Sequence, residues 1–174
     1  MTNEQRLKNL SVPTEPVDVV LDTDAYNEID DQFAIAYLLR SGDKLRTKAI
    51  YAAPFFNSRS TDPADGMNKS YDEVLKLLAL LGEDRPVLRG SEEYLPDEKT
   101  PVVSPAAEDL ARRALSYSPE NPLYVIAIGA ITNVASAILM YPEIKEKIAV
   151  IWLGGHARWF GGPEFNLQGD VNAA

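Results

Sequence analysis

Five short apolar runs alternate with segments of helical periodicity along the chain, and this alternation constrains the fold more than any other feature. The runs lie at residues 17–21, 48–53, 86–89, 123–128 and 148–153, and the helical segments at 31–40, 68–81, 105–116 and 132–140. Continuous apolar runs of this length are typical of strands buried on both faces, as in a parallel sheet. We therefore predict an α/β fold with a doubly wound, mainly parallel sheet and helices on both faces. This domain would span residues 17–174, after a flexible lead-in at 1–16.

Charge and residue usage exclude several classes of function. The chain has 17 basic and 26 acidic residues, a formal net charge of −9, which disfavours a nucleic-acid partner because such a partner needs a basic face. It has no cysteine and one histidine, which excludes thiolate nucleophiles and multi-histidine metal sites. Any metal must then be held by oxygen atoms, which favours Ca²⁺ or Mg²⁺.

The sequence also bears on location. The first ten residues, MTNEQRLKNL, lack the apolar region of a secretory signal, and no apolar run approaches the ~18 residues of a membrane span. We expect a cytoplasmic protein with no membrane partner, and we leave a homo-oligomer open.

Polar side chains follow four of the predicted strands, at the point where each strand ends. They are Asp22, Asp24, Asp30 and Asp31 after the first strand, Asn57 after the second, Thr132 and Asn133 after the fourth, and Glu164 and Asn166 after the fifth. Ligands of open α/β sheets bind outside the carboxyl ends of the strands. The sequence therefore predicts that these side chains share one edge of the sheet.

Clustered carboxylates repel one another, and a bound divalent cation is the simplest way to neutralise their charge. Asp24, Asp31 and a backbone carbonyl near Thr132 could supply part of a Ca²⁺ shell, while the remaining amide and carboxylate groups suit the hydroxyls of a sugar. The plainer interpretation is structural, since an Asp-rich turn and a Thr-Asn pair are also typical helix caps.

Four ordered blocks of sequence carry a family resemblance. They are Asp22-Thr-Asp24 followed by Asp30-Asp31, Gly129-Ala-Ile-Thr-Asn133, Pro142-Glu-Ile with Ile151-Trp-Leu-Gly-Gly155, and Glu164-Phe-Asn166. Together they resemble the inosine-uridine-preferring nucleoside hydrolases. The resemblance implies Ca²⁺-dependent hydrolysis of the N-glycosidic bond of purine or pyrimidine ribonucleosides, giving ribose and free base. It also implies that the family domain is incomplete at the C-terminus of this chain.

The resemblance assigns roles to individual residues. Asp24 would be the general base and a metal ligand, Asp31 a second metal ligand, and Thr132 a ligand through its backbone carbonyl. The residues that would hold the ribose hydroxyls are Asp30, Asn57, Glu164 and Asn166. The segment 25–29 is longer than the turn that the family usually has there. His156 does not fall at the family's leaving-group histidine, and we expect residues 158–160 beside it to form a packed loop.

Two other functions stay open at this point. A strand followed by Asp-x-Asp also resembles haloacid dehalogenase-like phosphatases, in which the first Asp is the nucleophile and the ion is Mg²⁺. Tyr26 stands where that family favours a smaller or β-branched residue, and Asp30 and Asp31 would be unexplained. The third alternative is a non-catalytic fragment that binds a cation, a pentose or another subunit.

Overall fold

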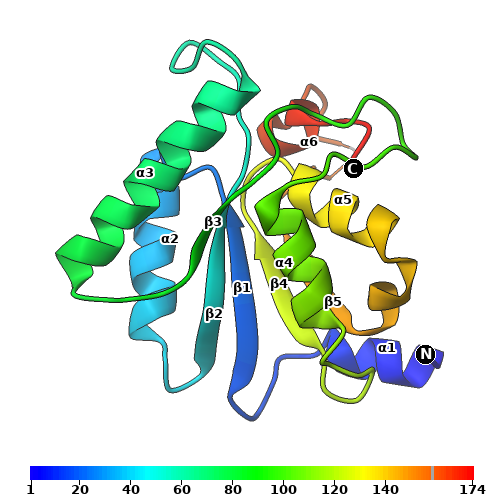
Figure 1. Cartoon of the computed structure of the whole chain (residues 1–174). Helices are drawn as coiled ribbons and strands as arrows, with labels where there is room; N and C mark the ends of the chain where they lie inside the picture. Colours follow the sequence, from blue (N-terminus) through cyan, green and yellow to red (C-terminus); the bar gives the residue numbers. More distant parts are fainter. Residues whose placement is uncertain (158) are drawn as a thin grey trace.

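A five-stranded parallel sheet with helices on both faces forms the centre of the molecule (Figure 1). The structure is a computed structural model that describes residues 1–157 and 159–174. The strands are β1 (Val17–Thr23), β2 (Leu45–Ala52), β3 (Val87–Arg89), β4 (Leu123–Ala127) and β5 (Ile148–Trp152). The helices are α1 (Asn3–Asn9), α2 (Ile29–Arg40), α3 (Pro63–Leu81), α4 (Pro105–Ala114), α5 (Thr132–Met140) and α6 (Phe165–Gly169), with a 3₁₀-helix η1 at Pro142–Glu146. The predicted α/β fold is confirmed, and no helix in the described part could cross a membrane.

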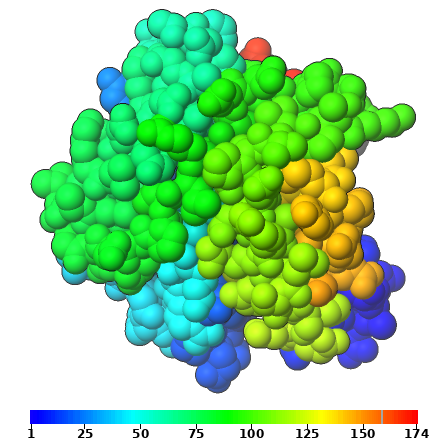
Figure 2. Space-filling model, in the orientation of Figure 1, coloured from blue at the N-terminus to red at the C-terminus, as the bar shows by residue number. Residues whose placement is uncertain are grey.

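Alternate residues of each strand enter two separate cores. Val20, Tyr51 and Val125 pack against α4 and α5 on one face of the sheet. Val19 and Ile50 pack against α2 and α3 on the other. This burial on both faces explains why the central parts of the strands are mostly apolar in sequence. Figure 2 shows, in the orientation of Figure 1, that α3 on the left and α4 near the centre cover most of the sheet when it is seen from this edge.

Local signals set the ends of the longer helices. Asp62 caps α3 by accepting a hydrogen bond from the backbone N–H of Asp65, and Gly82 ends the helix in a left-handed conformation. Ser104 caps α4 in the same way. Helix α3 therefore begins five residues earlier than the periodicity predicts, because its cap lies before the first apolar position.

Short elements near the two ends of the chain are the main difference from the prediction. Helix α1 lies within the expected lead-in, and the side chain of Thr2 caps it; the flexibility of that segment stays a prediction. Helix α6 lies in a tail for which no regular structure was expected, and Glu164 caps it. Arg158 lies outside the described residues, while Trp159 and Phe160 are 85% and 73% exposed, so the expectation of a packed loop is wrong for these two.

The order of the strands determines where a ligand can bind. The sheet runs β3-β2-β1-β4-β5, so the chain leaves β1 for β2 on one side and later returns to β4 on the other. The crossovers therefore diverge at the carboxyl ends of β1 and β4, which is where doubly wound sheets bind ligands. Residues 22–24 lie at this point.

Candidate active site

Three aspartates are buried together at the carboxyl end of β1. Asp22, Asp24 and Asp31 are 0%, 2% and 5% exposed. The first ends β1 with Thr23, the second follows the strand, and the third comes from the first turn of α2. The hydroxyl of Thr23 donates a hydrogen bond to Asp31, which ties the start of α2 to the end of the strand.

Burial and mutual repulsion make these carboxylates difficult to ionise. Burial, with a smaller contribution from the negative charge of Asp31, raises the pKa of Asp22 to about 7. Burial likewise raises the pKa of Asp24 to about 7, with added repulsion from Asp22 and Glu28. Burial, and then the charge of Asp24, raises the pKa of Asp31 to about 8. Among residues 1–157 and 159–174, no salt bridge to these three carboxyl groups offsets their repulsion.

Two asparagines hold the acidic cluster in place. Asn133 of α5 donates to Oδ1 of Asp22 at 2.8 Å, and Asn27 donates to Oδ2 of Asp24 at 2.9 Å. The side-chain oxygen of Asn27 in turn accepts from the amide of Asn57 at 2.6 Å. Asn27 belongs to the longer segment at 25–29, and sequence reasoning did not assign it a role.

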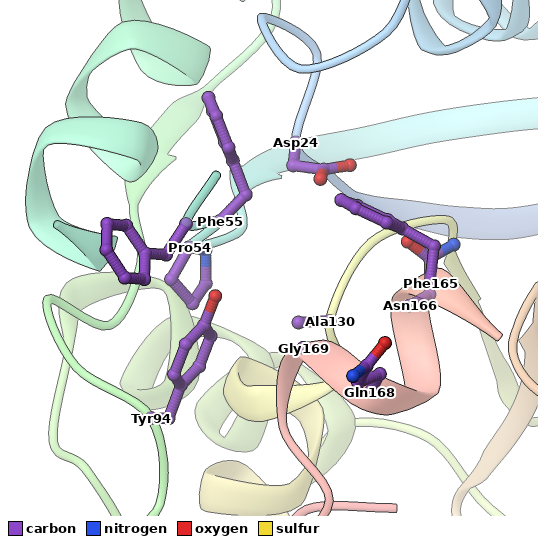
Figure 3. A pocket seen from close by; sticks show the side chains of 10 residues that line it. Asp24, Pro54, Phe55, Tyr94, Ala130, Phe165, Asn166, Gln168 and Gly169 are labelled. Carbon is purple, nitrogen blue, oxygen red and sulfur yellow. The ribbon is translucent and has the colours of Figure 1, made fainter. Parts of the chain in front are cut away.

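A pocket of about 320 Å³ opens beside Asp24 (Figure 3). Asp24 and Asn166 both line it, and so do Tyr94 and Gln168. The aromatic rings of Phe55, Phe56 and Phe165 form much of the wall.

Gly129, in the loop after β4, lies close to Asp24, because a Cβ at this position would be 3.0 Å from Oδ1 of Asp24. A glycine thus lets the loop after β4 approach this carboxylate.

The predicted site residues are distributed unevenly around this pocket. Asn57 reaches Asp24 indirectly, through Asn27. Thr132 is buried, and its hydroxyl donates to Asp170 at 2.8 Å. Asp30 is exposed and lines a separate shallow pocket beside Arg59, so the structure does not place it with Asn166.

The two predicted residues near α6 make structural contacts. Glu164 accepts backbone hydrogen bonds from Gly155, Asn166 and Leu167. Burial alone would raise the pKa of Glu164, but these N–H groups outweigh it and leave the pKa below its ordinary value. The amide of Asn166 donates to the carbonyls of Ile128 and Leu153, which fixes α6 against the ends of β4 and β5.

Sequence reasoning gave no role to Tyr94, which follows β3, or to Asp170, which follows α6 and lies just behind the block Glu164-Phe-Asn166. The rule that examines the residue after each strand would have found Tyr94 if it had been applied to the third strand as well. Asp170 is 3% exposed and accepts from both the Thr132 hydroxyl and the Leu95 backbone N–H. Nothing local in the sequence marks it, because its partners lie 38 and 75 residues away.

The donor atoms at this edge fit a hard cation in part. Oδ2 of Asp22 is buried without a hydrogen-bond partner in the described structure. Asp24 and Asp31 add carboxylates whose negative charges interact. Within residues 1–157 and 159–174, no group of three or more His, Asp or Glu side chains is arranged to hold a metal. A cation here would take two carboxylates, and the rest of its shell would come from carbonyls and water.

Without a divalent cation, we expect the melting temperature to fall as pH rises. The folded protein holds these three carboxyl groups with pKa values near 7 to 8, whereas the unfolded chain holds them near ~4. Their protonated forms favour the fold, so this stability is complete below about pH 4 and is lost as pH rises through about 7 to 8. Thermal unfolding followed by circular dichroism in a chelator, from about pH 5 to about pH 9, measures the effect.

The variant Asp22→Asn is the matched comparison, because it removes one of the three titrating groups and keeps the shape. Its melting temperature should fall less over the same range. A melting temperature that is flat or rises with pH in the unaltered protein would contradict the prediction.

Comparisons with known proteins connect this geometry to a family. The family model described as inosine-uridine preferring nucleoside hydrolase matches residues 19–174. A pyrimidine-specific ribonucleoside hydrolase, RihA of Citrobacter koseri, is 32% identical over 83% of this chain and 52% of its own length. A non-specific ribonucleoside hydrolase, RihC of Klebsiella pneumoniae, is 25% identical over 90% of this chain and 56% of its own. The chain therefore spans about half the length of these curated relatives.

Solved structures agree on the fold. A plant nucleoside hydrolase aligns with 91% of this chain and 55% of its own, at a TM-score of 0.67 and 24% identity. The type III effector XopQ, solved with adenosine diphosphate ribose, aligns with 100% of this chain and 58% of its own, at a TM-score of 0.68 and 19% identity. At these identities the likeness shows a common fold.

Proposed function

Since the chain belongs to the inosine-uridine preferring nucleoside hydrolase family, we propose that it carries the catalytic carboxylate and part of the sugar site of a Ca²⁺-dependent ribonucleoside hydrolase. The observation that carries this proposal is the position of Asp24. Its carboxylate is buried at the diverging crossovers of the sheet and lines the same pocket as Asn166. Hydrolysis would give ribose and a free purine or pyrimidine base.

The general base in this proposal is Asp24. A hydrogen bond from Asn27 to one carboxylate oxygen fixes its orientation. The other oxygen faces the backbone of Gly129, which has no side chain to block access. As the glycosidic bond breaks, Asp24 accepts a proton from the water that adds to C1′ of the sugar.

The metal ligands in this proposal are Asp24, Asp31 and the carbonyl of Thr132. When bound, Ca²⁺ would lower the pKa of a water and orient it toward the sugar. The hydroxyl of Thr132 donates to Asp170, which anchors the residue at the start of α5.

The sugar contacts in this proposal are Asn57, Glu164 and Asn166, whereas Asp30, which the resemblance also implies, lines a separate pocket and is not among them. Hydrogen bonds from the ribose hydroxyls to these groups would orient C1′ beside Asp24. Positive charge develops on the ribosyl ring in the transition state, and the buried acidic cluster stabilises it. Glu164 also positions Asn166 by capping α6.

Ribose release from inosine and from uridine tests the proposal. We expect both nucleosides to be cleaved, with reducing sugar measured over time and the free base identified by its absorbance. No release from either would contradict it. A parallel incubation with 4-nitrophenyl phosphate addresses the haloacid dehalogenase-like alternative, which the matches to known proteins do not support, and we expect no phosphate release.

The proposal also covers the location and the partners of the protein. We expect a cytoplasmic enzyme that takes ribonucleosides and has neither nucleic acid nor membrane as partner, consistent with the net charge of −9. A homo-oligomer remains an expectation.

A further inference from the structure

One wall of the pocket carries a tyrosine to which the proposed mechanism gives no role. Tyr94 lies in the loop between β3 and α4 and is half-buried. Tyr94 lies across the pocket from Phe165 and Asn166, and its hydroxyl end lies beside Pro54 (Figure 3). The negative charge of Asp24 acts on this hydroxyl, which places the two groups at the same cavity.

The hydroxyl of Tyr94 differs from those of the tyrosines that support the fold. Tyr51 donates to Asp109 at 2.7 Å, Tyr117 donates to Asp18 at 2.8 Å, and Tyr124 donates to the carbonyl of Asn9 at 3.3 Å. In the described part of the chain, the Tyr94 hydroxyl lies within hydrogen-bonding reach of the backbone N–H of Phe56, which lowers its pKa, and it has no acceptor for its own proton. A hydroxyl at the wall of an open pocket whose proton is not used within the fold can donate that proton in a hydrogen bond to a ligand.

The loop that carries Tyr94 is fixed on both sides by the C-terminal segment. The backbone N–H of Leu95 donates to Asp170 at 3.0 Å, and its carbonyl accepts from the amide of Asn172 at 2.8 Å. Leu95 itself is 3% exposed. A residue whose neighbour is held by two such bonds is positioned before any ligand arrives, as catalytic groups require.

The acid chemistry of Tyr94 suits a hydrogen-bond donor. Burial, together with the charges of Asp24 and Asp170, raises the pKa of Tyr94 to about 12. The phenol therefore keeps its proton at neutral pH and stabilises negative charge without having to give the proton away. The sole imidazole of the chain, His156, is exposed and is not among the residues that line this pocket.

We propose that Tyr94 is a catalytic residue that donates a hydrogen bond to the departing nucleobase. The inference rests on the proposed function. When the bond between C1′ and the base nitrogen breaks, the electron pair leaves with the base. Water adds to C1′ and gives its proton to Asp24, while the Tyr94 hydroxyl stabilises the charge on the base until solvent protonates it. The aromatic walls on either side accommodate the planar base.

Two substrates with different leaving groups test this role in the variant Tyr94→Phe, which keeps the ring and removes the hydroxyl. We expect kcat/KM for inosine and uridine to fall about 10- to 100-fold. Hydrolysis of 4-nitrophenyl β-D-ribofuranoside should change by less than about threefold, because nitrophenolate is a stable anion that needs no such donor. Tyr37→Phe, on the exposed outer side of α2, is the matched control and should leave both rates unchanged.

Each other outcome has a defined meaning. Equal losses on both kinds of substrate would show a structural role for Tyr94 and overturn the inference, as would unchanged nucleoside hydrolysis. Cleavage of the nitrophenyl riboside alone by the unaltered protein would also overturn it, because it would show that no residue effectively assists the departure of a nucleobase. If the unaltered protein cleaved neither substrate, the proposed function itself would fail, and this inference with it.

Discussion

Replacing Asp24 by Asn should lower the rate of ribose release about 100- to 10,000-fold while raising the melting temperature of the cation-free protein. The rate falls because an amide cannot accept the proton of the attacking water. The melting temperature rises because the substitution removes one of three buried, mutually repelling carboxylates and keeps the same size. We expect an increase of a few degrees at about pH 8 in a chelator, measured by thermal unfolding.

The opposite directions of the two effects make this prediction specific. A variant that merely damaged the fold would lose both activity and stability. Asp72→Asn is the matched control, since Asp72 is exposed and its nearest cation, Arg89, is 4.0 Å away. It should alter neither quantity. Full activity in Asp24→Asn would remove the proposed base, and a lower melting temperature would show that the carboxylate supports the fold.

The parallel α/β sheet could be predicted from the sequence because strands buried on both faces are mostly apolar. The apolar runs at 123–128 and 148–153 became β4 and β5 with nearly the expected bounds. Short helices such as α1 and α6 escaped detection because they have too few turns to show a period, and side-chain caps at Thr2 and Glu164 define them instead.

The candidate site was predictable only where the sequence places polar residues directly after strands. That rule brings Asp24 and Asn166 to one pocket. It does not reveal Asn27, because the conformation of the longer loop after β1 determines which side chains Asn27 contacts. It does not reveal Asp170 either, because the partners of Asp170 lie in distant elements. Asp30 follows the same strand as Asp24 but faces another surface, because α2 begins between the two and redirects the chain.

The three buried carboxyl groups at the end of β1 also predict a second large effect, which is that activity and stability depend on a divalent cation. Removing divalent ions with a chelator should reduce ribose release to background, and adding Ca²⁺ should restore it. In the same titration Ca²⁺ should raise the melting temperature at about pH 8, by an amount that corresponds to about 2.7 kcal/mol when Ca²⁺ is at about 100 times its Kd. At about pH 5, where the carboxyl groups are protonated, Ca²⁺ should have little effect.

Asp31→Asn separates a specific site from a general response to salt. Asp31 is buried at the start of α2 beside Thr23, so the substitution removes one proposed ligand and keeps a side chain that can still accept the Thr23 hydrogen bond. In the chelator, the variant should melt at a higher temperature than the unaltered protein. Added Ca²⁺ should raise its melting temperature by less. An equal response in both proteins would place the bound cation elsewhere. A larger increase in melting temperature with Mg²⁺ than with Ca²⁺ would contradict the proposed ion. Mg²⁺ requires a compact octahedral shell, whereas Ca²⁺ accepts the irregular mixture of carboxylate, carbonyl and water that this edge of the sheet offers.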